Sequence, residues 1–112
     1  MASDYGRGLL TATLRTTTQW AQDTLVAAQS GKRIRVAAVF LSAAAVAQTF
    51  TVWSGTVGGA RLFEAYMPIT LPIYLCAPPG EFLFETAVGA PLTVDSSAAG
   101  GAFCLVKYDV VP

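Results

Sequence analysis

The amino-acid sequence predicts an all-β protein, a compact β-sandwich with jelly-roll-like connections and an extended N-terminal arm. Two observations favour this fold. From Asp23 onward, short apolar segments are separated by Gly, Pro and Ser at intervals of roughly ten residues, a spacing typical of a sandwich or barrel. The chain has 112 residues, which is enough for one hydrophobic core but not for two. We therefore expect a single domain of about seven or eight short strands.

The expected strands follow from alternation and from turn residues. In the segment 49–53, Phe50 and Val52 face one side and the residues between them face the other. Every residue from 37 to 41 is apolar, so burial on both sides of the strand is expected there. Two prolines interrupt the segment 62–76, which predicts a sheet edge or a linking loop, because proline lacks the donor that a central ladder needs. Strands are expected over Leu25–Gln29, Ile34–Ser42, Thr49–Trp53, Leu62–Cys76 (as one or two strands), Phe82–Thr86, Leu92–Asp95 and Ala102–Val111.

Residues 1–22 differ in composition from the rest and are expected to form an extended arm, with the β-sandwich domain over residues 23–112. Three consecutive threonines, 16–18, favour extended chain, because β-branched side chains lose freedom in a helix. A helix around residues 18–28 stays open as the alternative. The domain is expected to fold without the arm, and contacts with other subunits are expected to hold the arm in place.

The composition indicates a protein that functions by packing against other protein subunits. Apolar residues make up 54% of the chain and charged residues 12%, roughly half of the charged share usual for a globular protein. A domain of this size cannot bury all of that apolar surface, and exposed apolar patches mark partner sites. Seven acidic and seven basic residues give no net charge, which argues against nucleic-acid binding.

No membrane association is expected. The longest apolar run, Val36–Ala47, is interrupted by Ser42 and is shorter than the roughly 20 residues that a spanning helix needs. The N-terminus does not resemble a signal peptide, because Asp4 and Arg7 precede only the short apolar pair Leu9–Leu10.

Most of the residue patterns that carry catalysis are missing from the sequence. Histidine, the commonest general base and metal ligand, does not occur, and no serine stands in a G-x-S-x-G motif. Glu81 and Glu85 would lie about 13 Å apart on one strand, too far for a glycosidase pair. The glycine pairs Gly58–Gly59 and Gly100–Gly101 match no phosphate-binding loop, and the acids form no calcium-binding pattern. We expect no enzyme activity, no catalytic residue, no metal site and no cofactor.

The two cysteines, Cys76 and Cys104, stand in apolar strand-like segments and share no short motif. Buried thiols are therefore expected, and a disulfide between the two is the alternative.

Aromatic residues are the remaining candidates for a functional surface. Most lie within apolar strands, where packing in a core or an interface is their usual role. Trp20 and Tyr66–Met67 differ, because they stand in the arm and in the proline-interrupted segment, where the domain's own core covers least. The alternative is a sugar-binding platform or stacking surface formed by some of Tyr5, Trp20, Trp53, Phe63, Tyr66, Tyr74 and Tyr108. Subunit contacts are expected at Tyr5, Leu9, Leu10, Trp20, Phe63, Tyr66, Met67 and Tyr74.

Several short motifs resemble those of a known group of proteins. They are Gly31–Val36 (GKRIRV), Trp53–Gly55 (WSG), Phe84–Gly89 (FETAVG), Ser97–Ala99 (SAA) and a closing strand with Tyr108. Together they resemble small structural proteins of tailed bacteriophages and prophages, with coverage from about Asp23 to Val110. The chain departs from that pattern in the arm and in residues 63–76, where the family often has a glycine-rich polar stretch.

The resemblance implies a β-sandwich virion component, most similar to a capsid decoration (cement) protein. Such a protein is made in the host cytoplasm and lies on the capsid surface, where a trimer bridges neighbouring subunits of the major capsid protein. The function expected from the sequence is therefore stabilisation of a head shell. The alternatives are a tail or receptor-binding module that binds carbohydrate through its aromatic residues, a small enzyme that uses carboxylates or tyrosines alone, and a bacterial periplasmic or surface β-domain.

Overall fold

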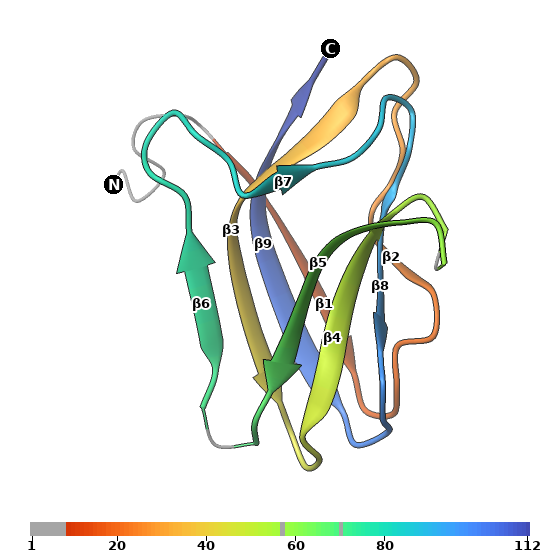
Figure 1. Cartoon of the computed structure of the whole chain (residues 1–112), viewed down its shortest axis with the longest axis vertical. Coiled ribbons are helices and arrows are strands. Elements are labelled where there is room, and N and C mark those ends of the chain that lie inside the picture. The colour runs from red at the N-terminus through yellow and green to blue at the C-terminus, as the bar shows by residue number, and fades with distance from the viewer. Residues whose placement is uncertain (1–8, 57, 70) are drawn as a thin grey trace.

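The computed structural model of the chain describes residues 9–56, 58–69 and 71–112. These residues contain strands and no helix, and the strands form two antiparallel sheets packed face to face (Figure 1). This confirms the all-β sandwich. Sheet A contains β1 (Leu10–Thr16), β9 (Ala102–Val111), β3 (Arg33–Ala43) and β6 (Ile73–Cys76) in that order, with β7 (Phe84–Glu85) also paired to β3. Sheet B contains β2 (Asp23–Val26), β8 (Leu92–Ser96), β4 (Gln48–Ser54) and β5 (Ala60–Met67) in that order.

The strand order is that of a jelly roll. Four antiparallel pairs, β1–β9, β2–β8, β3–β6 and β4–β5, are nested one inside the next. All four are centred near residues 57–59 of the chain, as the pairs Leu10–Tyr108 and Phe50–Ala65 illustrate. The fold is therefore one long hairpin whose successive pairs alternate between two sheets, the arrangement that defines a jelly roll.

The segment expected as a separate arm is instead part of the sandwich. Strand β1 pairs with β9 over its whole length, from Leu10 to Thr16. Ala12 and Leu14 pack against the core, whereas Thr11 and Thr13, which alternate with them, face outward. The extended conformation favoured by the threonines is confirmed. However, the structure shows no boundary at residue 22, and a domain that starts at residue 23 would lack an edge strand.

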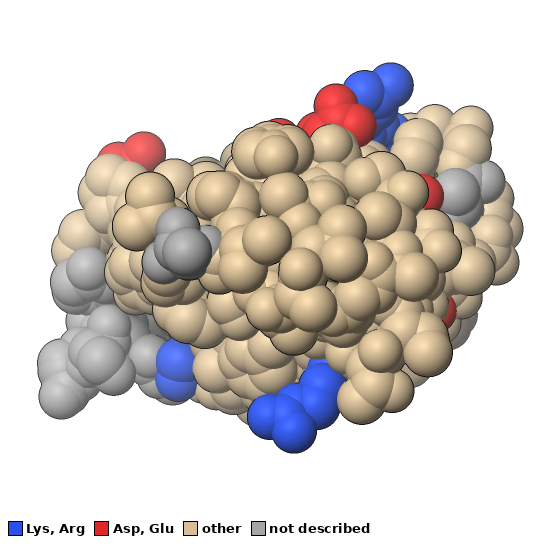
Figure 2. Space-filling view, turned by 90° about the horizontal axis from the view of Figure 1, so that it is seen from below, with Lys and Arg blue, Asp and Glu red and all other residues tan. Residues whose placement is uncertain are grey.

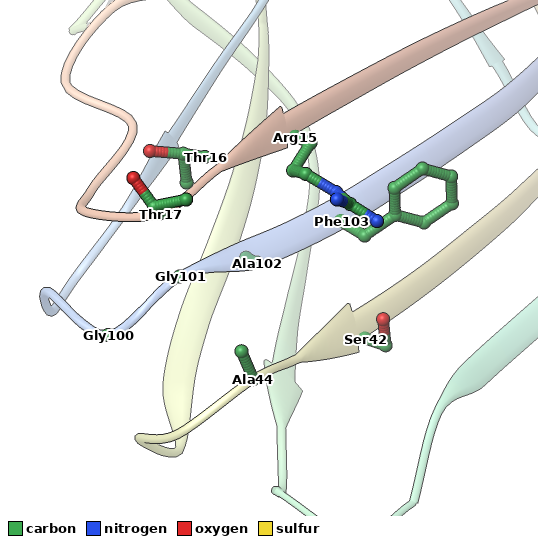
Figure 3. Close-up of a pocket in the computed structure, with 9 residues that line it drawn as sticks. All are labelled: Arg15, Thr16, Thr17, Ser42, Ala44, Gly100, Gly101, Ala102 and Phe103. Atoms are coloured by element: carbon green, nitrogen blue, oxygen red, sulfur yellow. The ribbon is translucent and has the colours of Figure 1, made fainter.

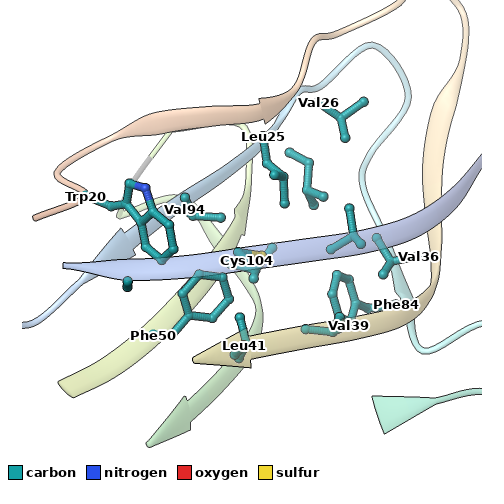
Figure 4. Close-up of a cluster of buried hydrophobic side chains, with 14 of the residues drawn as sticks. Trp20, Leu25, Val26, Val36, Val39, Leu41, Phe50, Phe84, Val94 and Cys104 are labelled. Carbon is teal, nitrogen blue, oxygen red and sulfur yellow. The ribbon is translucent and has the colours of Figure 1, made fainter. Parts of the chain in front are cut away.

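The core lies between the inner faces of the sheets and is closed at one end by Trp20 (Figure 4). Trp20 is fully buried, and its ring meets Phe50 edge to face at 5.4 Å between centroids. Its backbone is also held, since the Trp20 amide donates to Ser96 Oγ at 3.2 Å and the Ser96 amide donates to the Trp20 carbonyl at 2.9 Å. Trp20 thus joins the β1–β2 connection to β8 and to β4.

The other strands lie near their expected ranges, but β2 ends at Val26 rather than Gln29, and β7 covers only Phe84–Glu85 of the expected Phe82–Thr86. Phe50 and Val52 face the core, as their alternation predicted. The proline-interrupted segment supplies one of the two edge strands of each sheet, β5 in sheet B and β6 in sheet A, with Pro68 and Pro72 in the connection between them. Proline at these places costs no ladder hydrogen bond.

We predict that the chain needs β1 and Trp20 to fold. A chain that starts at Asp23 should show no cooperative unfolding in urea, whereas one that starts at Leu9 keeps both elements and should unfold cooperatively. In the full chain, Trp20→Ala should lower the free energy of unfolding by about 3–5 kcal/mol, the usual cost of truncating a buried aromatic side chain. The matched control Tyr66→Ala removes an exposed ring and should change it by less than about 0.5 kcal/mol. Cooperative unfolding of the 23–112 chain with a midpoint near that of the full chain would contradict this assignment.

Candidate interaction surface

The outer face of sheet A carries a row of apolar side chains that no part of the described chain covers completely. Tyr74 on β6 pairs with Phe40 on β3, which pairs with Leu105 on β9. Phe103 lies beside this row, with its ring edge to face against Phe40 at 6.2 Å between centroids. We call these four residues, Phe40, Tyr74, Phe103 and Leu105, the apolar face.

Strand alternation explains why these side chains point away from the core. Val39, Leu41, Cys104 and Val106 are fully buried, so Phe40, Phe103 and Leu105, which alternate with them, face outward. Tyr74 is the cross-strand partner of Phe40 and lies on the same face. Tyr74 is 64% exposed, and the other three members are partly exposed. The solvated face of an antiparallel sheet normally carries polar residues. Exposed apolar patches are typical of interaction sites, so this face is the candidate interaction surface.

The apolar face continues into an end of the sandwich that bears no charge. The four connections at this end, 17–22, 44–47, 68–72 and 97–101, contain no Lys, Arg, Asp or Glu. Figure 2 looks onto this end, where the centre is uncharged and charged atoms appear only around the rim. Val46, Ile69 and Leu71 are exposed there. Burying this end against a partner would leave no unpaired charge in the interface and so avoids that desolvation cost.

Backbone hydrogen bonds hold three of these connections together. The amides of Gly100 and Gly101 both donate to the Thr18 carbonyl, at 3.0 and 2.9 Å, and the Ala44 amide donates to the Gly101 carbonyl at 3.1 Å. Gly100 has a φ of +136°, and a Cβ there would lie 2.8 Å from Val46, so only glycine allows this close approach. The uncharged end is therefore a preformed surface.

A hollow of about 390 Å³ lies where the apolar face meets the uncharged end. Arg15 and Phe103, a cross-strand pair, form one wall, and Gly100, Gly101 and Ala44 lie at the opposite side (Figure 3). Arg15 is the charged residue among those that line it. The hollow has the size of a small ligand pocket and can accept a side chain from a docked protein.

The predicted contact residues differ in how far they are exposed. Leu10, Tyr66 and Tyr74 are exposed, and Leu9 and Phe63 are partly exposed. Phe63 stacks on Phe84 at 5.5 Å between centroids, so most of its contacts are internal. Tyr5 lies outside the described residues.

Trp20 and Met67 correct the prediction. Both side chains are fully buried in the domain's own core, so the expectation that they contact other subunits is wrong. The reason is the same for both. Each stands next to a turn, where the sequence does not show that the chain bends back over the core.

Tyr66 and Tyr74 lie on opposite outer faces of the molecule. Tyr66 pairs with Thr49 on sheet B, whereas Tyr74 belongs to sheet A. Phe40, Phe103 and Leu105 were not among the predicted contact residues. Burial on both sides was expected over residues 37–41, but Phe40 is only partly buried, because the described chain covers its outer side incompletely. The uninterrupted apolar run over residues 37–41 was the sequence feature that could have identified Phe40 as a contact residue.

The cysteines do not form a disulfide with each other. Cys104 is buried in the core, and burial raises the pKa of its thiol to about 12. Cys76 is exposed, contrary to the expectation of a buried thiol, because β6 is an edge strand. It stands two residues from Tyr74 on the same outer face of sheet A, and a hydrogen bond with Cys76 raises the pKa of Tyr74.

A cluster of charged side chains at the other end of β3 has a structural role. The Arg33 and Arg35 side chains donate to the two carboxylate oxygens of Glu85 at 2.6 and 2.9 Å. These hydrogen bonds lower the pKa of Glu85, first through Arg33 and then through Arg35. Since Arg35 and Glu85 are also cross-strand partners, the cluster holds the short strand β7 on sheet A.

Among the described residues, no three His, Cys, Asp or Glu side chains are grouped so that they could hold a metal ion. Over the same residues, no helix has the length and apolar character needed to cross a membrane.

No protein-family model matches the chain, and no curated protein or solved structure matches it. What the protein does must therefore be inferred from its own surface.

The Glu85 cluster leads to a pH-dependent prediction. Because the pKa of Glu85 is lowered in the folded state, its ion pairs stabilise the protein above the unfolded pKa of about 4.3. That contribution is lost as the pH falls below this value and through the folded pKa. Glu85→Gln should therefore reduce the free energy of unfolding at pH 7, and the difference from the wild type should vanish in acid.

Urea unfolding from pH 7 down to about pH 2.5 measures this difference. Glu81→Gln, which neutralises an exposed acid four residues away, is the control. A Glu85→Gln difference that stays constant across the pH range would show that the ion pairs are not its source.

Proposed function

We propose that this protein is a structural subunit that attaches to a larger protein shell through the apolar face and the adjoining uncharged end. The main support for this proposal is a row of apolar side chains on the outer side of sheet A. Tyr74, Phe40 and Leu105 form the row across three neighbouring strands, and Phe103 lies beside it. The sheet pairing fixes the backbone positions of these residues, so this protein would lose little backbone entropy when it docks.

The size of the molecule supports this proposal. A stable interface of standard size covers about 800 Å² on each partner. The chain exposes 5539 Å² in total, and its broad side measures 37 × 31 Å. One face is large enough for such a contact. Aromatic rings at the centre of an interface contribute most of its binding energy, and the apolar face supplies three of them.

The shell that we propose is a bacteriophage head, with the chain as a decoration, or cement, subunit. The resemblance of GKRIRV, FETAVG and SAA to phage structural proteins supports this choice. The jelly roll is compatible with it, since capsid proteins are among those built on that fold, although fold alone does not fix function. On this proposal the major capsid protein is the partner, the chain lies on the capsid surface, and it binds as a trimer whose combined contacts strengthen attachment.

We predict that a charge on the apolar face abolishes docking without unfolding the domain. Tyr74→Glu places a carboxylate at an exposed position, so the free energy of unfolding should change little. In a complex that carboxylate would lose water without gaining a partner, and affinity should fall at least tenfold. The matched control is Tyr66→Glu, because Tyr66 is 63% exposed but lies on sheet B.

The measurement is co-sedimentation of the purified protein with phage heads. The heads come from the phage that encodes this chain, after its gene for the chain has been deleted. The wild type and Tyr66→Glu should pellet with the heads, and Tyr74→Glu should stay in solution. The proposal fails if the wild type does not bind, and the assignment of the surface fails if both glutamate variants bind equally well.

A further inference from the structure

The outer face of sheet B differs from that of sheet A, because polar and charged side chains surround a second hollow there. Its volume is about 410 Å³, and Thr49, Thr51, Trp53, Glu64 and Asp95 contribute to its lining. We call it the polar groove. Pockets that bind small ligands have volumes of about 300–1,000 Å³, so the groove is large enough for one.

Two carboxylates flank a hydroxyl at the centre of the polar groove. Thr51 on β4 pairs with Glu64 on β5 at one side and with Asp95 on β8 at the other. The three residues therefore form a row across three strands, with the backbones of the two acids about 10 Å apart at the usual strand spacing. Thr51 Oγ1 donates to Glu64 Oε2 at 3.3 Å.

Both carboxylates are held in place but keep acceptor positions. Trp53 Nε1 donates to Asp95 Oδ1 at 2.8 Å, and Arg61 donates to Glu64 Oε1 at 3.1 Å. A carboxylate has about four acceptor positions, so each acid can accept further hydrogen bonds from a ligand. Such bonds to an ionised acceptor are stronger than those between neutral groups.

Aromatic rings stand along the same face. Trp53 lies at one end of the polar groove and is partly exposed. Tyr66 is 63% exposed and pairs with Thr49, which is four residues from Trp53 on β4, or about 13 Å along the strand. The Arg61 guanidinium lies 5.8 Å from the centre of the Trp53 ring. The side chain of Arg61 is 57% exposed, so it can move aside.

We propose that the polar groove binds a neutral oligosaccharide. Its hydroxyl groups would donate to Asp95 and Glu64, and the C–H faces of its rings would pack on Trp53 and Tyr66, which span the length of a short oligosaccharide. The two acids outnumber the single arginine of the groove, which disfavours nucleic acids and other polyanions. This function goes beyond docking to a shell. Because sheet B faces away from the apolar face, both can be occupied together.

The test uses the purified full chain with cello-, xylo-, malto- and N-acetylglucosamine oligomers as probes. Binding is followed by calorimetry and by tryptophan fluorescence. Trp20 is fully buried, so a change on binding reports Trp53. We expect at least one oligomer to bind, Tyr66→Ala and Asp95→Asn each to weaken that binding at least tenfold, and Trp53→Phe to remove the fluorescence change.

Tyr74→Ala is the matched control and should bind as the wild type does. Tyr66 is exposed, so loss of binding in Tyr66→Ala is not explained by unfolding, and a urea curve checks this for each variant. The proposal is overturned if none of the four oligomer series binds at about 10 mM, a concentration at which even weak millimolar sites fill. It is equally overturned if Tyr74→Ala weakens binding as much as Tyr66→Ala. Neither result would affect the docking assay, which depends on the other sheet.

Discussion

The pairing of β1 with β9 is the interaction on which the rest of this structure depends. It places the first and last strands side by side and makes β9 an interior strand of sheet A, between β1 and β3. The inward residues of β9, such as Cys104 and Val106, then fill the core, and the outward residues, Phe103 and Leu105, form half of the apolar face. Trp20 reinforces the pairing, because it buries the connection from β1 to β2 against Phe50.

The two sheets present different chemistry to their surroundings, and this difference carries the functional argument. The outer face of sheet A has apolar side chains whose transfer from water is favourable by roughly 25 cal/mol per Å². The outer face of sheet B has Glu64, Thr51 and Asp95 in one row, already hydrogen-bonded to neighbours. Burying those groups against an apolar partner would cost free energy, whereas a ligand rich in hydroxyl groups can satisfy them.

The sequence predicted the architecture well where residues alternate and turns are marked. Strands β3, β4, β8 and β9 lie where alternation and the Gly and Pro signals placed them. Strand β1 was misassigned to an arm because an edge strand needs few apolar residues, and only Ala12 and Leu14 face the core. Tyr74 was predicted as a contact residue, but Phe40 was not, since an apolar pattern on both sides cannot show whether the cover comes from the same chain. The polar groove depends on register between distant segments, which no local pattern contains.

Cys76 offers the most direct measurement of whether the apolar face is the docking surface. It is exposed next to Tyr74 on sheet A, whereas burial keeps the Cys104 thiol protonated and out of reach. Alkylation of the native protein by a maleimide should therefore modify Cys76. We predict that this reaction is fast in the isolated protein and at least tenfold slower when the protein is bound to head shells. Equal rates in the two states would show that this side of sheet A still faces solvent in the particle, and would contradict the account.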